Sequence, residues 1–168
     1  LKSLTHVQAN SKLRELWLWD CGIGAKTAAE LAKVISADMP NTDRLHSVSV
    51  RHAKFGGAPG VAFAEALAKS KSLSVLRLDA CGLDEAVAAA LGRCLGRNEG
   101  LKTLELFNSP VGDAGGVALL GGLGANKGLR ELYLYGLGLG EKSAEAAAAA
   151  VAAHPGLGLL DLAGNPLG

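Results

Sequence analysis

Two short segments of this chain resemble loops that bind phosphate groups. Residues 24–27 (GAKT) and 140–143 (GEKS) each combine a glycine, a lysine and a hydroxyl side chain. A phosphate-binding loop needs a glycine directly before the lysine and another glycine a few positions upstream, so that backbone N–H groups surround the anion. One residue intervenes between glycine and lysine in both segments, and both lie at the same place in a repeated pattern. Helix initiation explains them better than phosphate binding.

Other candidate chemistry is equally weak. Residues 135–140 (YGLGLG) lie between an expected strand and an expected helix, as a dinucleotide motif would, but lack the G-x-G-x-x-G spacing. No metal-ligand spacing with cysteines or carboxylates is found for the four histidines, which are His6, His46, His52 and His154. No nucleophile lies near a candidate base. We therefore expect no catalytic residue, no cofactor and no metal, and predict that the chain is not an enzyme.

Composition limits the possible partners and the cellular location of this chain. The formal net charge is +1, which gives no overall attraction for nucleic acid, and no apolar run approaches the roughly 20 residues that span a bilayer. Cys21 and Cys81 are expected about 10 Å apart, two strand spacings, and Cys94 lies in a helix, so no disulfide is predicted. Unpaired thiols and the absence of a glycosylation sequon predict an intracellular, cytoplasmic location.

One pattern, L-x-x-L-x-L-x-x-(C/N/S)-x-(L/I/V), recurs along the chain. It begins at six leucines, the last five spaced by 28 residues after a first gap of 32: Leu13, Leu45, Leu73, Leu101, Leu129 and Leu157. A fixed period of this size is typical of stacked repeats, each with a short strand, a turn, a helix and a return loop. One repeat cannot bury its own leucines, so neighbouring repeats must stack to close a core.

Local signals place the helices. We expect the first over 26–37, helix starts at Asp84, Asp113 and Ser143, and helix ends at Asn98, Asn126 and the pair 155–156. The helix after the fourth strand contains five glycines, which weaken it but would let it pack closely against neighbours. The repeat slot occupied by Cys21, Ala53, Cys81, Ser109, Leu137 and Asn165 is expected to face inward, where small or hydrogen-bonding residues suit a sharp turn.

The repeats predict one domain over 1–168. Residues 1–10 align with the back half of a helix, and 165–168 stop where a helix would begin. Terminal repeats normally carry a polar cap over the core. We therefore expect a piece of a longer array, or an array completed by other chains; the alternative is that flanking segments are simply not included.

Segments such as LRELWLWDCGIG, LSVLRLDACGL and LRELYLYGLGL resemble the ribonuclease-inhibitor-like class of leucine-rich repeats over essentially the whole chain. The resemblance implies an α/β fold: a right-handed solenoid, or horseshoe, of about six repeats, with parallel strands on the concave face and helices on the convex face. The insertion over 38–44 departs from the period. Carriers of this repeat include the ribonuclease inhibitor, sensor regions of intracellular immune receptors and the Ran GTPase-activating protein.

Alternation along the strands predicts which side chains leave the core. If Leu16 and Leu18 point inward, Trp17 and Trp19 point outward. Across the repeats the two outward columns contain both Trp, both Tyr and one of three Phe. Nine residues of these columns are the candidate partner-binding site: Trp17, Trp19, Arg51, Arg77, Asp79, Glu105, Phe107, Tyr133 and Tyr135. Exposed Trp, Tyr and Arg are typical of binding hot spots; the alternative is that the rings merely stack on one another along the strands.

Three functions remain open from the sequence. The first is a protein-binding scaffold or subunit that uses the concave sheet, with a protein partner or neighbouring subunits of a larger assembly, and without nucleic acid or membrane insertion. The second is a GTPase-activating regulator of the Ran GTPase-activating type. The third is the ligand-sensing region of an intracellular immune receptor.

Overall fold

The computed structural model describes residues 12–22, 24–36 and 45–168. Three sequence features lie outside these described residues: Ile23, which ends the leucine pattern that begins at Leu13, the insertion over 38–44, and the alignment of residues 1–10 with a helix.

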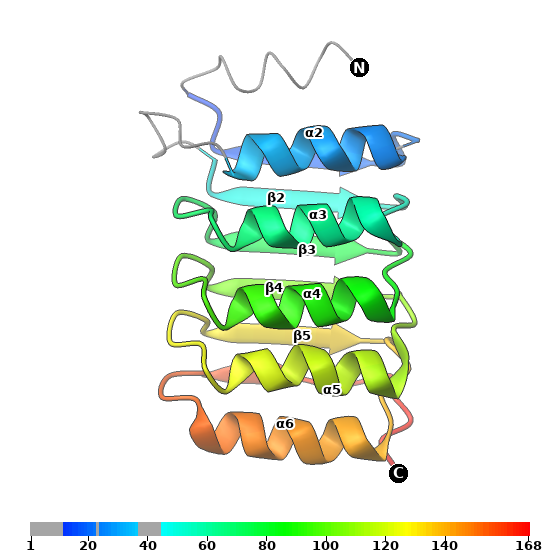
Figure 1. Ribbon diagram of the computed structural model, residues 1–168, viewed down its shortest axis with the longest axis vertical. Coiled ribbons are helices and arrows are strands. Elements are labelled where there is room, and N and C mark those ends of the chain that lie inside the picture. The colour runs from blue at the N-terminus through cyan, green and yellow to red at the C-terminus, as the bar shows by residue number, and fades with distance from the viewer. Residues whose placement is uncertain (1–11, 23, 37–44) are drawn as a thin grey trace.

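Six strands form one sheet in which every neighbouring pair is parallel (Figure 1). The strands lie in the sheet in the order in which they occur along the chain. Their bounds are β1 Glu15–Trp19, β2 Ser47–Arg51, β3 Val75–Asp79, β4 Thr103–Phe107, β5 Glu131–Tyr135 and β6 Leu159–Asp161. Each strand begins at the repeat position that the leucine pattern predicts.

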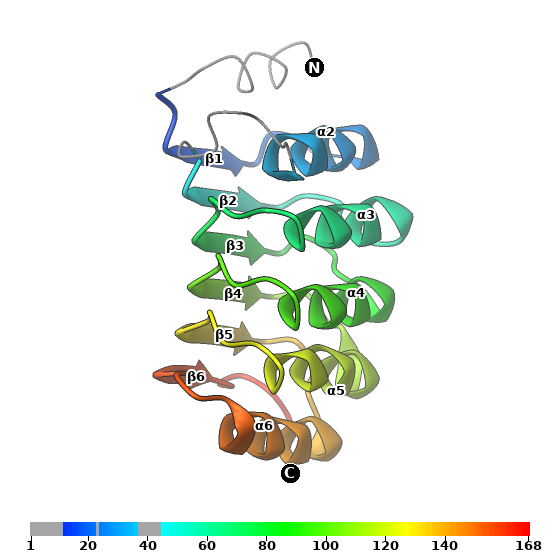
Figure 2. The same ribbon diagram turned by 60° about the vertical axis from the view of Figure 1, so that its left-hand side comes forward.

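Five helices of the described residues lie between successive strands and cover one face of the sheet, which gives two layers (Figure 2). They are α2 Ala25–Ser36, α3 Ala58–Leu67, α4 Glu85–Leu95, α5 Gly112–Leu123 and α6 Glu141–Ala153. The other face of the sheet, which we call the open face, carries no helix of the described residues. The α/β class and the parallel sheet are thus confirmed, and the first helix begins and ends one residue before its predicted bounds. No helix among the described residues has the length and apolarity to cross a membrane.

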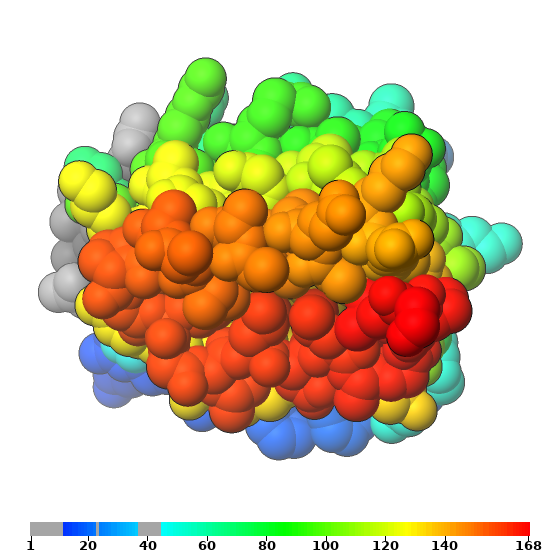
Figure 3. Space-filling model, turned by 90° about the horizontal axis from the view of Figure 1, so that it is seen from below, coloured from blue at the N-terminus to red at the C-terminus, as the bar shows by residue number. Residues whose placement is uncertain are grey.

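The core lies between the two layers. Leu76 and Leu104 are fully buried, as are Leu106, Leu132 and Leu134 (0–1% exposed). Residues of the last repeat cover the end of the stack (Figure 3). The corresponding leucines there, Leu157, Leu160 and Leu162, are only partly buried. A buried leucine side chain contributes about 1.5–3 kcal/mol, so stacking the layers provides most of the stability of the fold.

Buried asparagines join successive repeats between helix and strand. Asn126 Nδ2 donates to the carbonyl oxygens of Leu95 and Asn98, both at 2.6 Å, and its Oδ1 accepts from the N–H of Leu129 at 2.7 Å. Asn98 makes the equivalent contacts one repeat earlier. The predicted helix ends at these asparagines are wrong by about one turn, since the helices end at Leu95 and Leu123. The side chains instead satisfy carbonyls that the helix ends leave unpaired.

The slot after the strand has the predicted hydrogen-bonding role in three of the repeats. Asn165 Nδ2 donates to the carbonyl of Leu134 at 2.6 Å, and its Oδ1 accepts from Leu137 N–H at 2.8 Å. Ser109 Oγ accepts from the N–H of Cys81 at 3.2 Å. Cys81, Ser109 and Asn165 thus form hydrogen bonds to the preceding repeat. Ala53 and Leu137 are buried without a polar side chain, and Cys21 is exposed, so the predicted inward position is wrong for Cys21.

Of the three residues predicted to begin a helix, one is an N-cap in the structure. Asp84 is the N-cap of α4 and accepts from Val87 N–H at 3.0 Å. Asp113 lies inside α5, and its carboxylate accepts from the N–H groups of Gly140 and Ser143 at the start of α6. Ser143 is likewise inside α6. The predictions for Asp113 and Ser143 were wrong because a cap can be supplied by the neighbouring repeat.

Close packing explains only some of the glycines in α5. A Cβ on Gly122 would lie 1.8 Å from the carbonyl oxygen of Gly92 in α4, and one on Gly116 would lie 2.3 Å from Ser143 Oγ in α6. A Cβ on Gly121 would meet nothing within 4 Å. Gly116 and Gly122 thus permit the predicted close approach of helices, whereas Gly121 has no packing role.

Candidate functional site

The register of the sheet builds the open face. In one column Trp17 pairs with Ser49, then Arg77, Glu105, Tyr133 and Asp161 on successive strands. In the next column the order is Trp19, Arg51, Asp79, Phe107 and Tyr135. All nine predicted residues lie in these columns, and their leucine neighbours face the helices. The predicted outward direction of the rings is confirmed.

The first aromatic cluster is the pair Trp17 and Trp19 on β1. Their ring centroids are 5.0 Å apart and the ring planes lie within 23°, so the indoles stack. Trp19 Nε1 donates to Ser49 Oγ at 3.1 Å, and Trp17 Nε1 donates to Glu15 at 3.1 Å. Trp17 remains 56% exposed and Trp19 47% exposed. Hydrogen bonds therefore hold the rings in position while a large apolar area faces solvent.

The second aromatic cluster consists of Phe107, Tyr133 and Tyr135 on β4 and β5. Phe107 meets the two tyrosines edge to face, with centroids 6.5 and 6.4 Å away. Desolvation, followed by the charges of Glu131 and Glu105, raises the pKa of the Tyr133 phenol above its usual value. Tyr133 therefore stays a neutral hydrogen-bonding group at physiological pH.

Between the two clusters lies a zone of charge on β2 to β4. Arg51 Nε is 3.0 Å from Asp79 Oδ2, and Arg77 Nε is 2.8 Å from Glu105 Oε1. Asn108 Nδ2 donates to the other oxygen of Asp79 at 2.8 Å. The sequence predicted that alternating charges could pair across strands, and these contacts confirm it. The ion pairs hold these charged side chains in position between the two aromatic clusters.

A residue in the left-handed backbone region follows each of the first five strands and recurs after the sixth. Four are not glycine: Asp20, His52, Ala80 and Asn108 have φ of 50–53°. Gly136 and Gly164 complete the series at the same 28-residue spacing. This feature was not predicted from the sequence, although the aligned Gly136 and Gly164 and the turn-forming Asp20 and Asn108 indicated it.

Gly164 also supports the second aromatic cluster. A Cβ at this position would lie 2.8 Å from Cε2 of Tyr135, so the tyrosine ring rests directly against the glycine backbone. The position of an exposed ring on β5 is thus set by a residue of the next repeat. No pattern in the sequence pointed to this contact.

The discounted phosphate-loop segment 140–143 has a structural explanation. Asp113 already occupies the anion position at the start of α6, with its Oδ1 at 2.9 Å from Gly140 N and 2.8 Å from Ser143 N. Hydrogen bonds from Ser143, first from its hydroxyl, lower the pKa of Asp113 below its usual value. The N–H groups that would bind a phosphate therefore hold a carboxylate of the same chain.

The remaining titratable residues do not assemble into a site. Within residues 12–22, 24–36 and 45–168 no three His, Cys, Asp or Glu side chains are grouped to hold a metal ion. His6 lies outside the described residues, and His52 contacts Asp20 at the rim of the open face. The three cysteines are unpaired, as predicted. Burial raises the pKa of Cys81 to about 11, so this thiol is not a nucleophile at neutral pH.

Comparison with solved structures shows which folds this chain resembles. Actin-binding site 2 of leiomodin-1 matches with a TM-score of 0.72 at 18% identity, covering 90% of this chain and 87% of that chain. The C-terminal domain of Caenorhabditis elegans tropomodulin matches with a TM-score of 0.69 at 12% identity, covering 90% of each chain. No family model and no curated protein matches the sequence. The likeness therefore establishes the fold.

These comparisons correct the predicted family. The assignment to ribonuclease-inhibitor-like leucine-rich repeats is wrong, because the similar structures are a leiomodin and a tropomodulin domain and no family model matches. The physical reason is that the leucine pattern reports strand spacing and burial. Both are demanded by packing and do not identify one family.

The same finding overturns the predicted functions. A leucine-rich-repeat scaffold, a regulator of the Ran GTPase-activating type and the sensing region of an immune receptor were each inferred from carriers of the assumed repeat. The similar structures belong instead to leiomodin and tropomodulin. The nine open-face residues were placed independently of the family and keep their geometry.

Proposed function

We propose that this chain is an actin-binding domain that presents the open face of its sheet to its partner. The fold likeness to an actin-binding site of leiomodin-1 and to tropomodulin supports the class of partner. The observation that carries the surface assignment is the stacked pair Trp17 and Trp19, half exposed on a face that no described helix covers.

The exposed aromatic side chains of the open face favour burial of this face against a partner. Large aromatic side chains lose little conformational entropy on binding and provide much of the affinity of typical interfaces. The Trp pair and the Phe107–Tyr133–Tyr135 cluster would each provide an apolar anchor. The paired charges of Arg51, Asp79, Arg77 and Glu105 between them would set orientation and specificity.

The proposed partner also implies a location and a kind of activity. Because actin is intracellular, we propose that the chain acts inside the cell, and that it binds its partner without catalysing a reaction. We also propose that residues 1–168 act as one domain whose stacked repeats curve as a solenoid, with the open face on the concave side. Small-angle scattering would distinguish a curved stack from a flat one.

Cosedimentation with filamentous actin and titration of labelled monomeric actin would test the function. The variant Trp17→Ala/Trp19→Ala should bind actin at least tenfold more weakly, because several kcal/mol of anchor area are lost. The variant Tyr135→Ala should also weaken binding.

The matched control removes exposed apolar side chains from the helix layer. Val117 and Val151 are 37% and 45% exposed on α5 and α6. Val117→Ala/Val151→Ala should leave actin binding unchanged, and circular dichroism should be the same for all variants. An actin affinity that is equal in the Trp variant and the unmodified chain would refute the surface assignment, and no binding of either actin form would refute the partner.

A further inference from the structure

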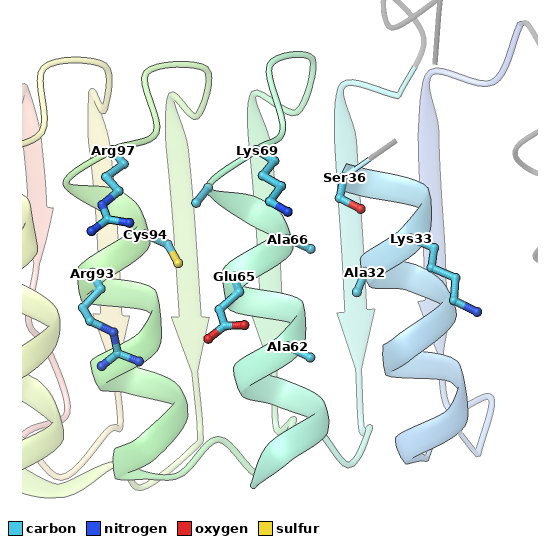
Figure 4. A pocket seen from close by; sticks show the side chains of 11 residues that line it. Ala32, Lys33, Ser36, Ala62, Glu65, Ala66, Lys69, Arg93, Cys94 and Arg97 are labelled. Carbon is cyan, nitrogen blue, oxygen red and sulfur yellow. The ribbon is translucent and has the colours of Figure 1, made fainter. Parts of the chain in front are cut away.

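A hollow of about 690 Å³ lies in the helix layer, between α2, α3 and α4 (Figure 4). Its floor consists of small side chains, among them Ala62, Ala66 and Cys94. Four cations also line it: Lys33, Lys69, Arg93 and Arg97. We call this hollow the basic groove. It lies on the opposite layer from the open face, so it is independent of the proposed actin surface.

The charge of the basic groove is largely uncompensated. Lys33 forms an ion pair with Glu30 at 2.7 Å. Across the described ranges, Lys69, Arg93 and Arg97 take part in no ion pair within 4.0 Å. Glu30 neutralises Lys33, and Glu65 is the one lining carboxylate, so the four cations leave a local charge of +2, whereas the whole chain carries +1.

The helix dipole does not explain this concentration. Cations near a helix C-terminus are favourable, because they interact with the unpaired carbonyls of the last turn. However, α5 and α6 have no basic residue in the last turn, and they are equally part of the layer. The last turns of α5 and α6 carry no cation, whereas the groove is lined by Arg93 in the last turn of α4 and by Lys69 and Arg97 just after α3 and α4.

The groove is elongated. A second hollow of about 440 Å³ shares Ala68, Lys69 and Arg97 with the first and adds Lys71 and Glu99. Together the two hollows run from α2 across α3 and α4 to the turn that follows α4. A single phosphate would fill only a small part of this space, whereas an extended chain with several negative charges matches its length and charge.

We propose that the basic groove binds an acidic peptide segment of a partner protein. Arginine presents paired N–H donors that match a carboxylate, so Arg93 and Arg97 are the expected anchors. Lys69, which follows α3, adds charge beside them, whereas Lys33 on α2 points away from α3 and is paired with Glu30 (Figure 4). The small floor at Ala62 and Ala66 leaves room for the peptide backbone.

Fluorescence anisotropy with a labelled ten-residue polyglutamate peptide tests the proposal, with polyglutamine of the same length as the neutral probe. Polyglutamate should bind and polyglutamine should not. Arg93→Glu/Arg97→Glu should weaken polyglutamate binding by roughly tenfold or more, because attraction becomes repulsion. Lys142→Glu, an exposed cation on α6 outside the groove, should change it by less than about twofold.

A second variant separates a groove from general charge attraction. Ala62 is exposed at the floor, so Ala62→Leu fills the hollow without changing the charge or the buried core. This variant should also lose polyglutamate binding. Equal binding by Ala62→Leu and the unmodified chain, or equal losses in Lys142→Glu and Arg93→Glu/Arg97→Glu, would overturn the proposal.

One further measurement identifies the class of ligand, and another separates the groove from the open face. Vesicles containing phosphorylated lipids that bind more tightly than the peptide, with the same dependence on Arg93 and Arg97, would replace the peptide proposal by a membrane one. Trp17→Ala/Trp19→Ala should keep full polyglutamate binding even where actin binding is lost. The two proposals can therefore fail separately.

Discussion

Arg77 and Glu105 face each other across β3 and β4, with Arg77 Nε 2.8 Å from Glu105 Oε1. Their side chains are 40% and 16% exposed, and they lie between the two aromatic clusters of the open face. The pair neutralises the centre of this face without removing it from solvent. Water screens such a pair, so its contribution to folding is small and its main effect is on orientation.

A double-mutant cycle should measure this small contribution. We expect Arg77→Met, Glu105→Gln and the double variant to give a coupling free energy of about 0.2–1 kcal/mol in urea unfolding. The coupling should decrease in high salt, because exposed charges are screened. A coupling that is large and insensitive to salt would show that the pair stabilises the sheet as a buried ion pair would.

Neighbouring glycines of α5 should respond oppositely to alanine. Gly121→Ala should stabilise the fold by about 0.5–1 kcal/mol, because alanine favours the helix and its Cβ meets nothing. Gly122→Ala should destabilise it by about 1–3 kcal/mol, because its Cβ would collide with the carbonyl of Gly92 and push α5 from α4. Thermal and urea unfolding measure both; effects of the same sign would contradict the packing assigned to Gly122.

The left-handed residues after the strands offer a route to stabilisation. Ala80 has φ 50°, a conformation that costs a non-glycine residue about 1–2 kcal/mol. Ala80→Gly should relieve this strain and raise the free energy of unfolding by up to about 1 kcal/mol, since glycine also makes the unfolded chain more flexible. The converse change, Gly136→Ala at φ 64°, should lower it. A destabilised Ala80→Gly would show that the alanine methyl makes a compensating contact.

Stability should fall in mild acid through His154. Burial, and secondarily the charge of Arg130, lower the pKa of this histidine below 6.5. Its Nδ1 accepts from Gly156 N–H at 3.1 Å, which requires the neutral ring. Because the folded pKa lies below the unfolded one, the unfolded state takes up the proton first. The stability is therefore complete above about pH 6.5, is lost as pH falls from there, and levels off below the folded pKa.

Urea unfolding between pH 8 and pH 5 measures this effect, with His154→Gln as the comparison. The variant should lose the part of the pH dependence that falls below pH 6.5 and should be less stable than the unmodified chain at pH 8. His46→Gln, at an exposed position, is the matched histidine control. An unchanged pH profile in His154→Gln would show that another group is responsible.

The period of the leucines was enough to predict the strands and the faces of their side chains. Alternation along a strand leaves one set of positions for the core, so once Leu104 and Leu106 were assigned inward, Glu105 and Phe107 had to face outward. The parallel sheet followed because successive strands were separated by helices. The exposed tryptophans and tyrosines were therefore predictable from local sequence.

The family, the capping partners and the basic groove were not predictable in this way. The leucine pattern is set by burial and is shared by unrelated functions, so it misled the family and functional assignments. Asp113 caps α6 and Gly164 supports Tyr135 only because repeats stack at a particular distance. Lys69 and Arg93 are far apart in the chain and line one hollow only because α3 and α4 pack side by side in the helix layer.

The sequence by itself determined the repeating αβ units, the burial of the leucines and the direction of the rings, because these depend on the backbone geometry within one repeat. The tertiary structure decided which side chains from different repeats come together: two aromatic clusters around a paired charge zone on the open face, and a basic groove on the other layer. Such contacts depend on the spacing and rotation between stacked repeats, which no single repeat encodes.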